Sequence, residues 1–209
     1  MDPSINNLLK WSIENTAPST DNPSAVAGEG HTTRAIDPEA LRRLLSNAPS
    51  DAELMKAAIQ VARDPQDSLE NRLIAFDNFE QLVENLDNAN NMEPLGLWTP
   101  LVDTLNDPVP DIRKMAAWCI GTAVQNNEKS QERLLVFKGI PQLLRMARED
   151  PDLTVRRKSI YAISSAVRNY QPALDELKRH LPADIVGADE KLDAGDMDRI
   201  NEIIARLRE

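Results

Sequence analysis

Glycine and aromatic residues are scarce in this chain. Only 7 of its 209 residues are glycine, and aromatic side chains make up 4% of the total. This composition suits stacked helices better than a sandwich of β-sheets. No run approaches the roughly 20 apolar residues that a transmembrane helix needs, and the N-terminal residues lack the basic and apolar regions of a signal peptide. We therefore expect an all-α, cytoplasmic protein with no membrane partner.

Residues that could carry out chemistry are equally rare. The only cysteine, Cys119, excludes an internal disulfide, which fits a reducing compartment, and we expect it to be a small buried residue. His31 and His180 are far apart, and neither has a second ligand at the spacing of a zinc site. No glycine-rich phosphate-binding motif occurs. We expect no enzyme activity, no catalytic residue, no metal and no cofactor.

Positive charge is in deficit. The chain has 24 lysines and arginines against 34 aspartates and glutamates, which gives a formal net charge of −10. Nucleic-acid-binding proteins usually show a basic stripe, and the sequence has none. We expect a monomer whose partner is a protein with a basic or mixed surface, and no nucleic acid.

What the sequence does contain is an internal repeat. Residues 107–126 read DPVPDIRKMAAWCIGTAVQN, and residues 150–169, 43 positions later, read DPDLTVRRKSIYAISSAVRN. Seven of the twenty positions are identical, and the end of the pattern also occurs 41 residues earlier, at residues 82–85. A helical period in the low forties is typical of armadillo and HEAT solenoids. The repeat predicts an armadillo-like α-solenoid of about three repeats, which is a binding fold.

Each copy has an apolar face and a polar face when it is placed on a helix. With 3.6 residues per turn, one stripe about 100° wide collects the side chains expected to face the core. These are Ile112, Ala116, Cys119, Ile120, Ala123 and Val124 in the first copy, and Val155, Ser159, Ala162, Ile163, Ala166 and Val167 in the second. Trp118 and Tyr161 share a position on the opposite face. They either pack against the next helix or line an open face as aromatic anchors.

Composition divides the rest of the chain. Residues 1–16 form an apolar N-terminal segment, and residues 17–36, rich in proline, serine, threonine and glycine, form a flexible linker. Residues 37–180 hold the armadillo repeats. Residues 181–209 form an acidic loop and a helix that caps the exposed end of the core. The tethered apolar segment docks either on the domain itself or on a partner.

Local signals place the helices. Ser50 and Glu53 form a capping-box pattern ahead of a helix at residues 54–63. A long helix is expected at residues 69–86, with Leu86 on its core side beside Phe76, Phe79 and Val83, and residues 87–91 (DNANN) then form a polar corner. Further helices are expected from Asp37, at residues 98–105, 128–137, 140–147 and 171–180, and from Asp196 through Arg208.

Several strings of residues resemble a known family. Residues 75–80 (AFDNFE), 82–91 (LVENLDNANN) and 97–98 are similar to the first armadillo unit of the nucleotide exchange factors for heat-shock protein 70. Residues 120–127 (IGTAVQNN) are similar to the next unit, and residues 8–13 to the family's N-terminal segment. A general armadillo consensus does not require these strings, so the resemblance is specific.

The resemblance implies a function and a partner. Family members wrap the concave armadillo face around one lobe of the chaperone's ATPase domain, so that ADP leaves and ATP can rebind and trigger client release. In some relatives the N-terminal segment mimics a client, and here that role would fall to Leu8, Leu9, Lys10, Trp11 and Ile13. Longer members have a complete fourth unit, whereas the array in this chain stops after Arg168.

We expect the chaperone to contact a band along the polar sides of the long helices. On this hypothesis the binding residues are Asp77, Gln81, Glu84, Asp87, Asn88, Ala89, Asn90, Trp118, Thr122, Gln125, Tyr161, Ser165 and Arg168. The polar corner is the leading candidate, although it could simply end a helix, and Ala89→Arg is expected to abolish binding without unfolding the domain. The alternative function is a generic adaptor for an extended peptide. Against it, Thr122 and Ser165 stand where peptide-binding armadillo proteins usually have asparagine.

Overall fold

The computed structural model describes residues 49–187 and 190–208, and from Ser50 onward these belong to one compact unit. The predicted N-terminal segment, the linker and the helix expected from Asp37 lie outside the described residues. Within the described ranges, all regular secondary structure is helical, which confirms the all-α prediction. No helix in these ranges combines the length and the apolar character needed to cross a membrane.

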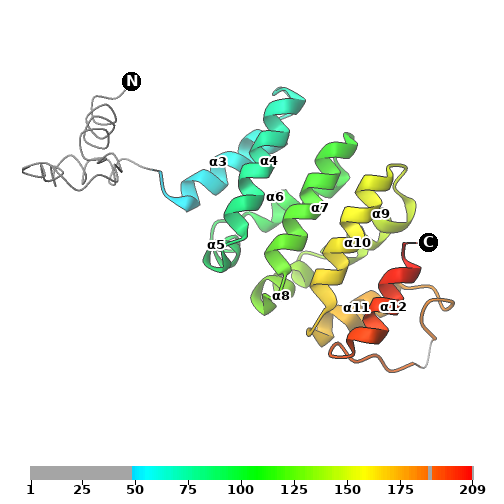
Figure 1. The fold of residues 1–209 in the computed structure, drawn as a ribbon. Helices are drawn as coiled ribbons and strands as arrows, with labels where there is room; N and C mark the ends of the chain where they lie inside the picture. The colour runs from blue at the N-terminus through cyan, green and yellow to red at the C-terminus, as the bar shows by residue number, and fades with distance from the viewer. Residues whose placement is uncertain (1–48, 188–189, 209) are drawn as a thin grey trace, which may run out of the picture. The chain divides into compact units, whose positions relative to one another are not determined.

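The unit is a stack of helices joined by short turns (Figure 1). Its α-helices are α3 (Asp51–Arg63), α4 (Leu69–Val83), α5 (Leu86–Asn91), α6 (Trp98–Asp103), α7 (Pro110–Val124), α8 (Glu128–Val136), α9 (Gly139–Glu149), α10 (Leu153–Val167), α11 (Gln171–His180) and α12 (Met197–Arg206). A 3₁₀ turn, η1 (Thr104–Asn106), continues α6. The long helices α4, α7 and α10 lie side by side, with α7 packed between the other two. The arrangement is an α-solenoid.

The first described helix begins as its sequence predicts. The Ser50 side chain accepts a hydrogen bond from the backbone N–H of Glu53 at 3.3 Å, and the Glu53 carboxylate accepts one from the backbone N–H of Ser50 at 2.8 Å. These two bonds complete the capping box and satisfy backbone donors that the first turn leaves free. The bond to Ser50 also lowers the pKa of Glu53.

The turns between units explain one of the repeated residues. Asn126 and Asn169 follow α7 and α10 with φ angles of 52° and 56°. This is the left-handed region, which asparagine enters more readily than most residues because its short polar side chain can bond locally. The same residue therefore ends the same turn in both copies.

The core contains the apolar stripes read from the repeat. The first-copy residues named above are at most 1% exposed, and those of the second copy are buried as well. Cys119 lies among them with its Sγ 3.7 Å from the carbonyl oxygen of Phe76 on α4. Burial raises the pKa of the Cys119 thiol, so the thiol is neutral and serves as a small core residue, as predicted.

The long helix predicted at residues 69–86 is shorter than expected. α4 ends at Val83, and α5 is a separate helix that contains the polar corner. The break lies at Asn85, whose backbone is extended and whose Oδ1 accepts from the backbone N–H groups of Asp87 and Asn88 at 2.9 and 3.4 Å. Because Asn85 caps a new helix, it does not continue the old one. Leu86, predicted to be in the core, is consequently 57% exposed.

The C-terminal helix seals the end of the core. The Asp196 side chain caps α12 by accepting from the backbone N–H of Arg199 at 3.0 Å. The predicted apolar face is confirmed: Ile200, Ile203 and Ile204 are at most 3% exposed, and Leu207 is 7% exposed. The loop before α12 is tied to the end of α10, because the backbone N–H of Asn169 donates to the carbonyl oxygen of Ala194 at 2.9 Å.

Candidate partner-binding surface

The three long helices share one polar side, which we call the long-helix face. It comprises Asp77 and Gln81 on α4 with Glu84 directly after it, Trp118, Thr122 and Gln125 at α7, and Tyr161 and Arg168 at α10. Asp77, Gln81, Glu84 and Gln125 are exposed, and the others are half-buried. All of these belong to the band predicted from the sequence. Ser165, also predicted, is only 9% exposed and offers little surface to a partner.

Hydrogen bonds join neighbouring helices across this face. The Tyr161 hydroxyl on α10 donates to Oε1 of Gln125 at 3.1 Å, and the Thr122 hydroxyl on α7 donates to Oε1 of Glu80 at 2.6 Å. Within α4, Gln81 donates to Asp77 at 2.8 Å. Glu80 is 6% exposed and was not predicted as a site residue. The face is therefore one connected surface rather than three separate rows.

Lys158, which was not predicted as a site residue, also belongs to the face. The ammonium of Lys158 lies 3.4 Å from the ring centroid of Trp118 and 5.5 Å from that of Tyr161. Both distances fit cation–π contacts. Burial lowers the pKa of Lys158, and the nearby Glu80 carboxylate opposes that shift. The sequence signal that could have identified Lys158 was its position three residues before Tyr161, which puts both side chains on one side of α10.

The face continues onto the capping helix. Arg168, just after α10, donates from Nη2 to Oδ1 of Asn201 on α12 at 2.6 Å and from Nε to Oγ of Ser164 at 3.2 Å. Arg168, the last residue of the predicted band, is thus held in place by the capping helix α12. Asn201 is exposed beside it and was not singled out from the sequence.

The polar corner is more structural than expected. Asn88 is 7% exposed and donates from Nδ2 to the Asp51 carboxylate at 2.8 Å and to the carbonyl oxygen of Leu82 at 3.0 Å, so it ties α5 to α3 and α4. Ala89 is 2% exposed. An arginine there would have no room, so Ala89→Arg is expected to disturb the packing, contrary to the sequence-based expectation. The exposed residues of the corner are Asp87 and Asn91, and only Asp87 belongs to the predicted band.

Asn90 completes the corner and is unusual. Its Oδ1 is buried and has no hydrogen-bond partner among the described residues. Buried polar atoms in folded proteins are normally bonded, because an unpaired one costs about 1–3 kcal/mol. Asn90 is half-buried as a whole, which leaves part of it accessible at the edge of α5. The predicted contribution of Asp87 and Asn90 stays a prediction.

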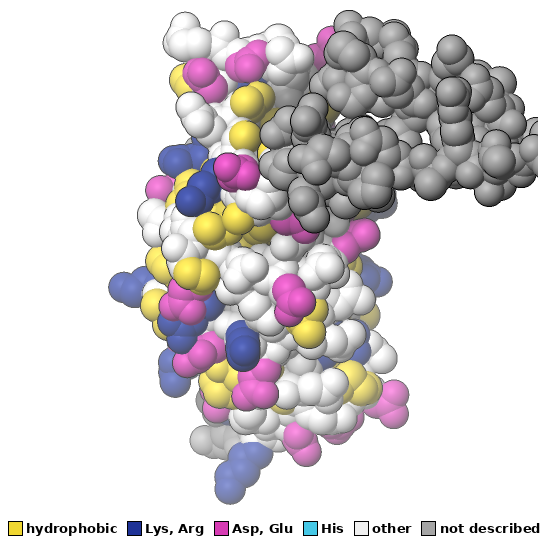
Figure 2. All heavy atoms as spheres, turned by 90° about the vertical axis from the view of Figure 1, so that its left-hand side faces the viewer, with side chains coloured by type: hydrophobic (Ala, Val, Ile, Leu, Met, Phe, Trp, Pro, Cys, Tyr) yellow, Lys and Arg dark blue, Asp and Glu magenta, His cyan; other side chains and the backbone are white. Residues whose placement is uncertain are grey.

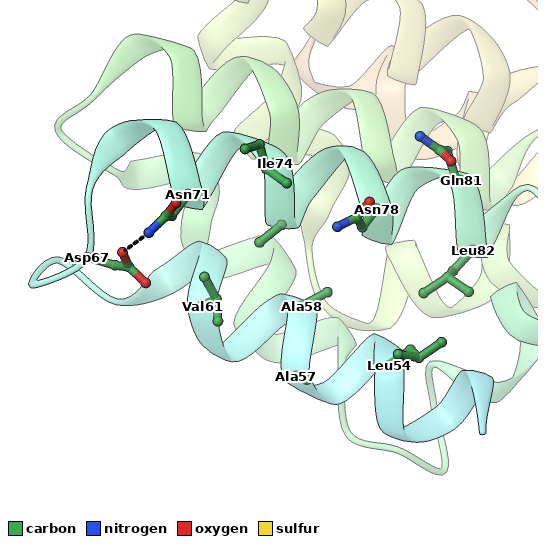
Figure 3. A pocket seen from close by; sticks show the side chains of 11 residues that line it. Leu54, Ala57, Ala58, Val61, Asp67, Asn71, Ile74, Asn78, Gln81 and Leu82 are labelled. Atoms are coloured by element: carbon green, nitrogen blue, oxygen red, sulfur yellow. Dashed lines mark hydrogen bonds between the residues drawn. The ribbon is translucent and has the colours of Figure 1, made fainter. Parts of the chain in front are cut away.

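A groove beside the long-helix face was not predicted. It lies between α3 and α4, has a volume of about 770 Å³, and includes Gln81 of the face at its edge. In Figure 3, Leu54 on α3 lies opposite Leu82 on α4. Leu54 and Ile74 are 40% and 53% exposed. Figure 2, which views this side of the molecule, shows hydrophobic side chains open to the surface between charged ones. Ile74 is an apolar residue outside the core stripe of α4, and this was the sequence signal that could have predicted the groove.

Comparison with known proteins decides which family this is. Residues 5–92 match the family model described as nucleotide exchange factor Fes1, and residues 88–182 match the SIL1/FES1/HPBP1 C-terminal domain. A curated protein of Coccidioides immitis, named Hsp70 nucleotide exchange factor FES1, is 64% identical over 210 residues. The alignment covers 100% of this chain and 99% of that protein. The chain belongs to the FES1 family of nucleotide exchange factors.

Other FES1 proteins agree with this placement. The relative from Gibberella zeae is 50% identical over 212 residues, and the alignment covers 100% of this chain and 97% of that protein. The FES1 protein of Kluyveromyces lactis is 41% identical, but the match spans 82% of this chain and only 58% of that longer protein. The family resemblance noted in the sequence is confirmed. The two matched regions meet in α5, at the polar corner.

Proposed function

We propose that this chain is a nucleotide exchange factor for Hsp70: a non-enzymatic, cytoplasmic co-chaperone. It binds the chaperone's ATPase domain as a monomer, through the long-helix face, and accelerates ADP release. The observation that carries the proposal is the 64% identity, over the whole chain, to a protein that bears this name. A connected polar and aromatic surface across α4, α7 and α10 supports the choice of face.

The long-helix face has the properties of a protein-binding surface. Trp118 and Tyr161 are half-buried aromatic residues, a type enriched where interfaces gain most of their binding energy. The ring of Trp118 is covered by Lys158, and the hydroxyl of Tyr161 is bonded to Gln125, so these side chains are already held in place. Little rotamer freedom then remains to be lost on binding, which favours affinity.

The exchange activity follows from preferential binding. A factor that binds the open-cleft state of the ATPase domain more tightly than the ADP-closed state shifts the chaperone toward the open state. The shift cannot exceed that difference in affinity, and each tenfold preference is worth about 1.4 kcal/mol. By linkage, ADP must weaken binding of this chain to Hsp70 by the same factor. No nucleotide chemistry by this chain is required.

The proposal is tested by stopped-flow release of a fluorescent ADP analogue from cytosolic Hsp70. Wild-type protein is expected to accelerate release to a saturating rate. The triple variant Gln81→Ala, Gln125→Ala, Tyr161→Ala removes accessible side chains from three neighbouring positions of the face and should need about tenfold more protein for the same acceleration. The matched control is Lys129→Ala, Val136→Ala on α8, two exposed positions outside the face, and it should behave as wild type.

Two outcomes would contradict the proposal. If the triple variant and the α8 control were equally active, the long-helix face would not be the binding surface. If wild-type protein bound Hsp70 without accelerating ADP release, the chain would be an adaptor or an inhibitor, and peptide binding would be examined next. Circular dichroism of each variant shows whether a loss of activity reflects unfolding.

The N-terminal segment extends the proposal. Residues 5–92 match the family model, so this segment belongs to the family's own sequence. We propose that Leu8, Leu9, Lys10, Trp11 and Ile13 occupy the client site of the chaperone, because apolar side chains with one cation suit a site that binds unfolded segments. Deletion of residues 1–34 should then leave ADP release intact and slow client release. Lost exchange activity would refute this division of roles.

A further inference from the structure

Arginine is concentrated in one pocket at the C-terminal end of the solenoid. The pocket lies between α9, α10 and α12, has a volume of about 610 Å³, and is lined by Arg148, Arg156, Arg157, Arg206 and Arg208. The other described residues that line it are apolar, and none of the described lining residues is acidic. Such a cluster is unexpected in a chain with a net charge of −10. None of these residues belongs to the long-helix face.

The five guanidinium groups have no acidic partner among residues 49–187 and 190–208. Within the described ranges, no aspartate or glutamate oxygen comes within 4.0 Å of any of them. Arg206 donates from Nη1 to the backbone carbonyl oxygen of Asp184 at 2.7 Å. The nearby Asp152 carboxylate is occupied as the N-cap of α10, where it accepts from Thr154 and Val155. As far as the described residues show, the pocket is therefore positively charged and its arginines are not paired with carboxylates.

The preceding units show what one of these arginines normally binds. Arg72 on α4 pairs with the Asp107 carboxylate at 2.6 Å, and both side chains are at most 15% exposed. Arg113 on α7 pairs with Asp150 through Nε and Nη2, at 2.7 and 2.9 Å, in a two-pronged contact. In each case the carboxylate opens the following unit. The long helices are thus linked by a series of buried arginine–aspartate pairs.

Arg156 on α10 is the third member of the series, and no carboxylate of the described residues pairs with it. Nη1 of Arg113 donates to the carbonyl oxygens of Asp107 and Pro108 at 2.8 and 3.1 Å. Nη1 of Arg156 makes the same contacts one unit later, with Asp150 and Pro151 at 2.7 and 3.3 Å. Its Nε and Nη2, which bind the aspartate in Arg113, have no hydrogen-bond partner among the described residues. Arg156 also lines the pocket.

We infer that this pocket binds an acidic segment of a partner protein, whose carboxylate pairs with Arg156 as Asp150 pairs with Arg113. A guanidinium that keeps a two-pronged edge open matches the geometry of a carboxylate. Arg148 and Arg157, both exposed, would hold neighbouring acidic residues. Apolar surface is also available, because Leu153 is 47% exposed and Ile185 is half-buried. A segment that mixes acidic and aliphatic side chains therefore fits better than a bare phosphate.

The inference can be tested without the chaperone. The probe is a short fluorescein-labelled peptide of alternating glutamate and leucine, titrated with the full chain and followed by fluorescence anisotropy. We expect saturable binding, and at least tenfold weaker binding of a matched peptide of glutamine and leucine. The variant Arg148→Glu, Arg157→Glu should weaken probe binding at least tenfold. Lys56→Glu, Lys129→Glu changes the net charge equally at exposed positions away from the pocket and should have little effect.

Arg156→Lys examines the shape of the contact rather than its charge. Lysine keeps the positive charge but cannot make a two-pronged contact, so a three- to fivefold loss of affinity is expected. Thermal unfolding of each variant confirms that the fold is retained.

Several outcomes would overturn the inference. They are no probe binding up to about 1 mM, the weak end of specific recognition, equal losses in the pocket and control variants, or equal affinity for the glutamine peptide. Displacement of the probe by inorganic phosphate, at concentrations where acetate has no effect, would reassign the pocket to phosphate. Self-association abolished by Arg148→Glu, Arg157→Glu would make a second copy of this chain the occupant.

Discussion

The joint between α7 and α10 and the joint between α10 and α12 are built from different contacts. Both joints cover the apolar side of a long helix. The first joint adds a buried ion pair, Arg113 with Asp150, and a close approach at Gly121. The second relies on the isoleucine-rich face of α12 and on the contact between Arg168 and Asn201, while Arg156 has no acidic partner in the part of the chain that the structure describes.

The difference shows that the last unit of a solenoid can bury its apolar stripe without pairing its arginine with a carboxylate. A cap must bury the last apolar stripe, since exposed core would otherwise aggregate. It need not reproduce the ion pair of an internal joint, because an arginine at the surface can remain hydrated. The terminal joint is therefore expected to be weaker and more dependent on pH than the internal one.

The largest expected effect comes from breaking the internal ion pair. Arg113→Ala leaves the carboxylate of Asp150, 5% exposed, without its partner, and should lower the free energy of unfolding by about 3 kcal/mol. Arg156→Ala removes only bonds to backbone carbonyls and should cost about 1 kcal/mol. Urea unfolding of both variants measures the difference. Equal losses would mean that the two joints do not differ in this way.

A smaller effect is expected at the position where α7 and α10 approach each other. A Cβ atom added at Gly121 would lie 2.5 Å from Cε1 of Tyr161 and 3.1 Å from Cα of Ala162. Gly121→Ala should therefore cost about 1–2 kcal/mol, despite the better helix propensity of alanine. The matching residue of α10 is Ser164. Ser164→Ala removes the acceptor of Arg168 Nε, but alanine has the better helix propensity, so stability should change by less than about 0.5 kcal/mol. Thermal unfolding distinguishes the two, and a stabilising Gly121→Ala would contradict the close approach.

The smallest effect is a pH dependence at the terminal joint. Arg199 on α12 holds Glu190 by two hydrogen bonds, at 2.6 and 2.9 Å, and the pKa of Glu190 is lowered mainly by that bonding. A carboxyl group whose pKa is lower in the folded state stabilises the fold above its ordinary pKa of 4.5, and this contribution is lost as the pH falls through the folded-state value. Acidification should therefore loosen α12 before it affects α7.

Methyl NMR of Ile203 on α12 and Ile120 on α7, followed as the pH is lowered, measures this order. Glu190→Gln is the control: it removes the titrating group, so the signal of Ile203 should lose most of its pH dependence. Simultaneous loss of both methyl signals would show that the cap is not a separate unit.

The repeat and its helical period predicted the helices and most of the core. Ile112 and Val155, which are related by the 43-residue offset, are both buried as predicted, and the apolar face of α12 was predicted correctly from its isoleucines. The same reasoning extended α4 too far, because Asn85 fits a helix by periodicity while its side chain caps the next one. Burial of Ala89 follows from that local break and could not be read from composition.

Features that depend on how units pack were not predictable from one sequence. Lys158 lies over Trp118 only because α10 packs against α7 at a particular height and angle. Arg113 and Asp150 are 37 residues apart, and the sequence alone does not indicate that they pair. The band across α4, α7 and α10 was nevertheless expected, since equivalent positions of successive repeats align along a solenoid.

The rate at which a thiol reagent modifies the buried Cys119 reports how often α4 and α7 separate. Cys119 is 0% exposed, on the side of α7 that contacts α4. A thiol reagent can reach it only in molecules where those helices have separated. It is the sole cysteine of the chain, so the rate of alkylation reports one event at one place. In the limit of fast reclosing, that rate gives the fraction of molecules open at any moment, with no label added to the protein.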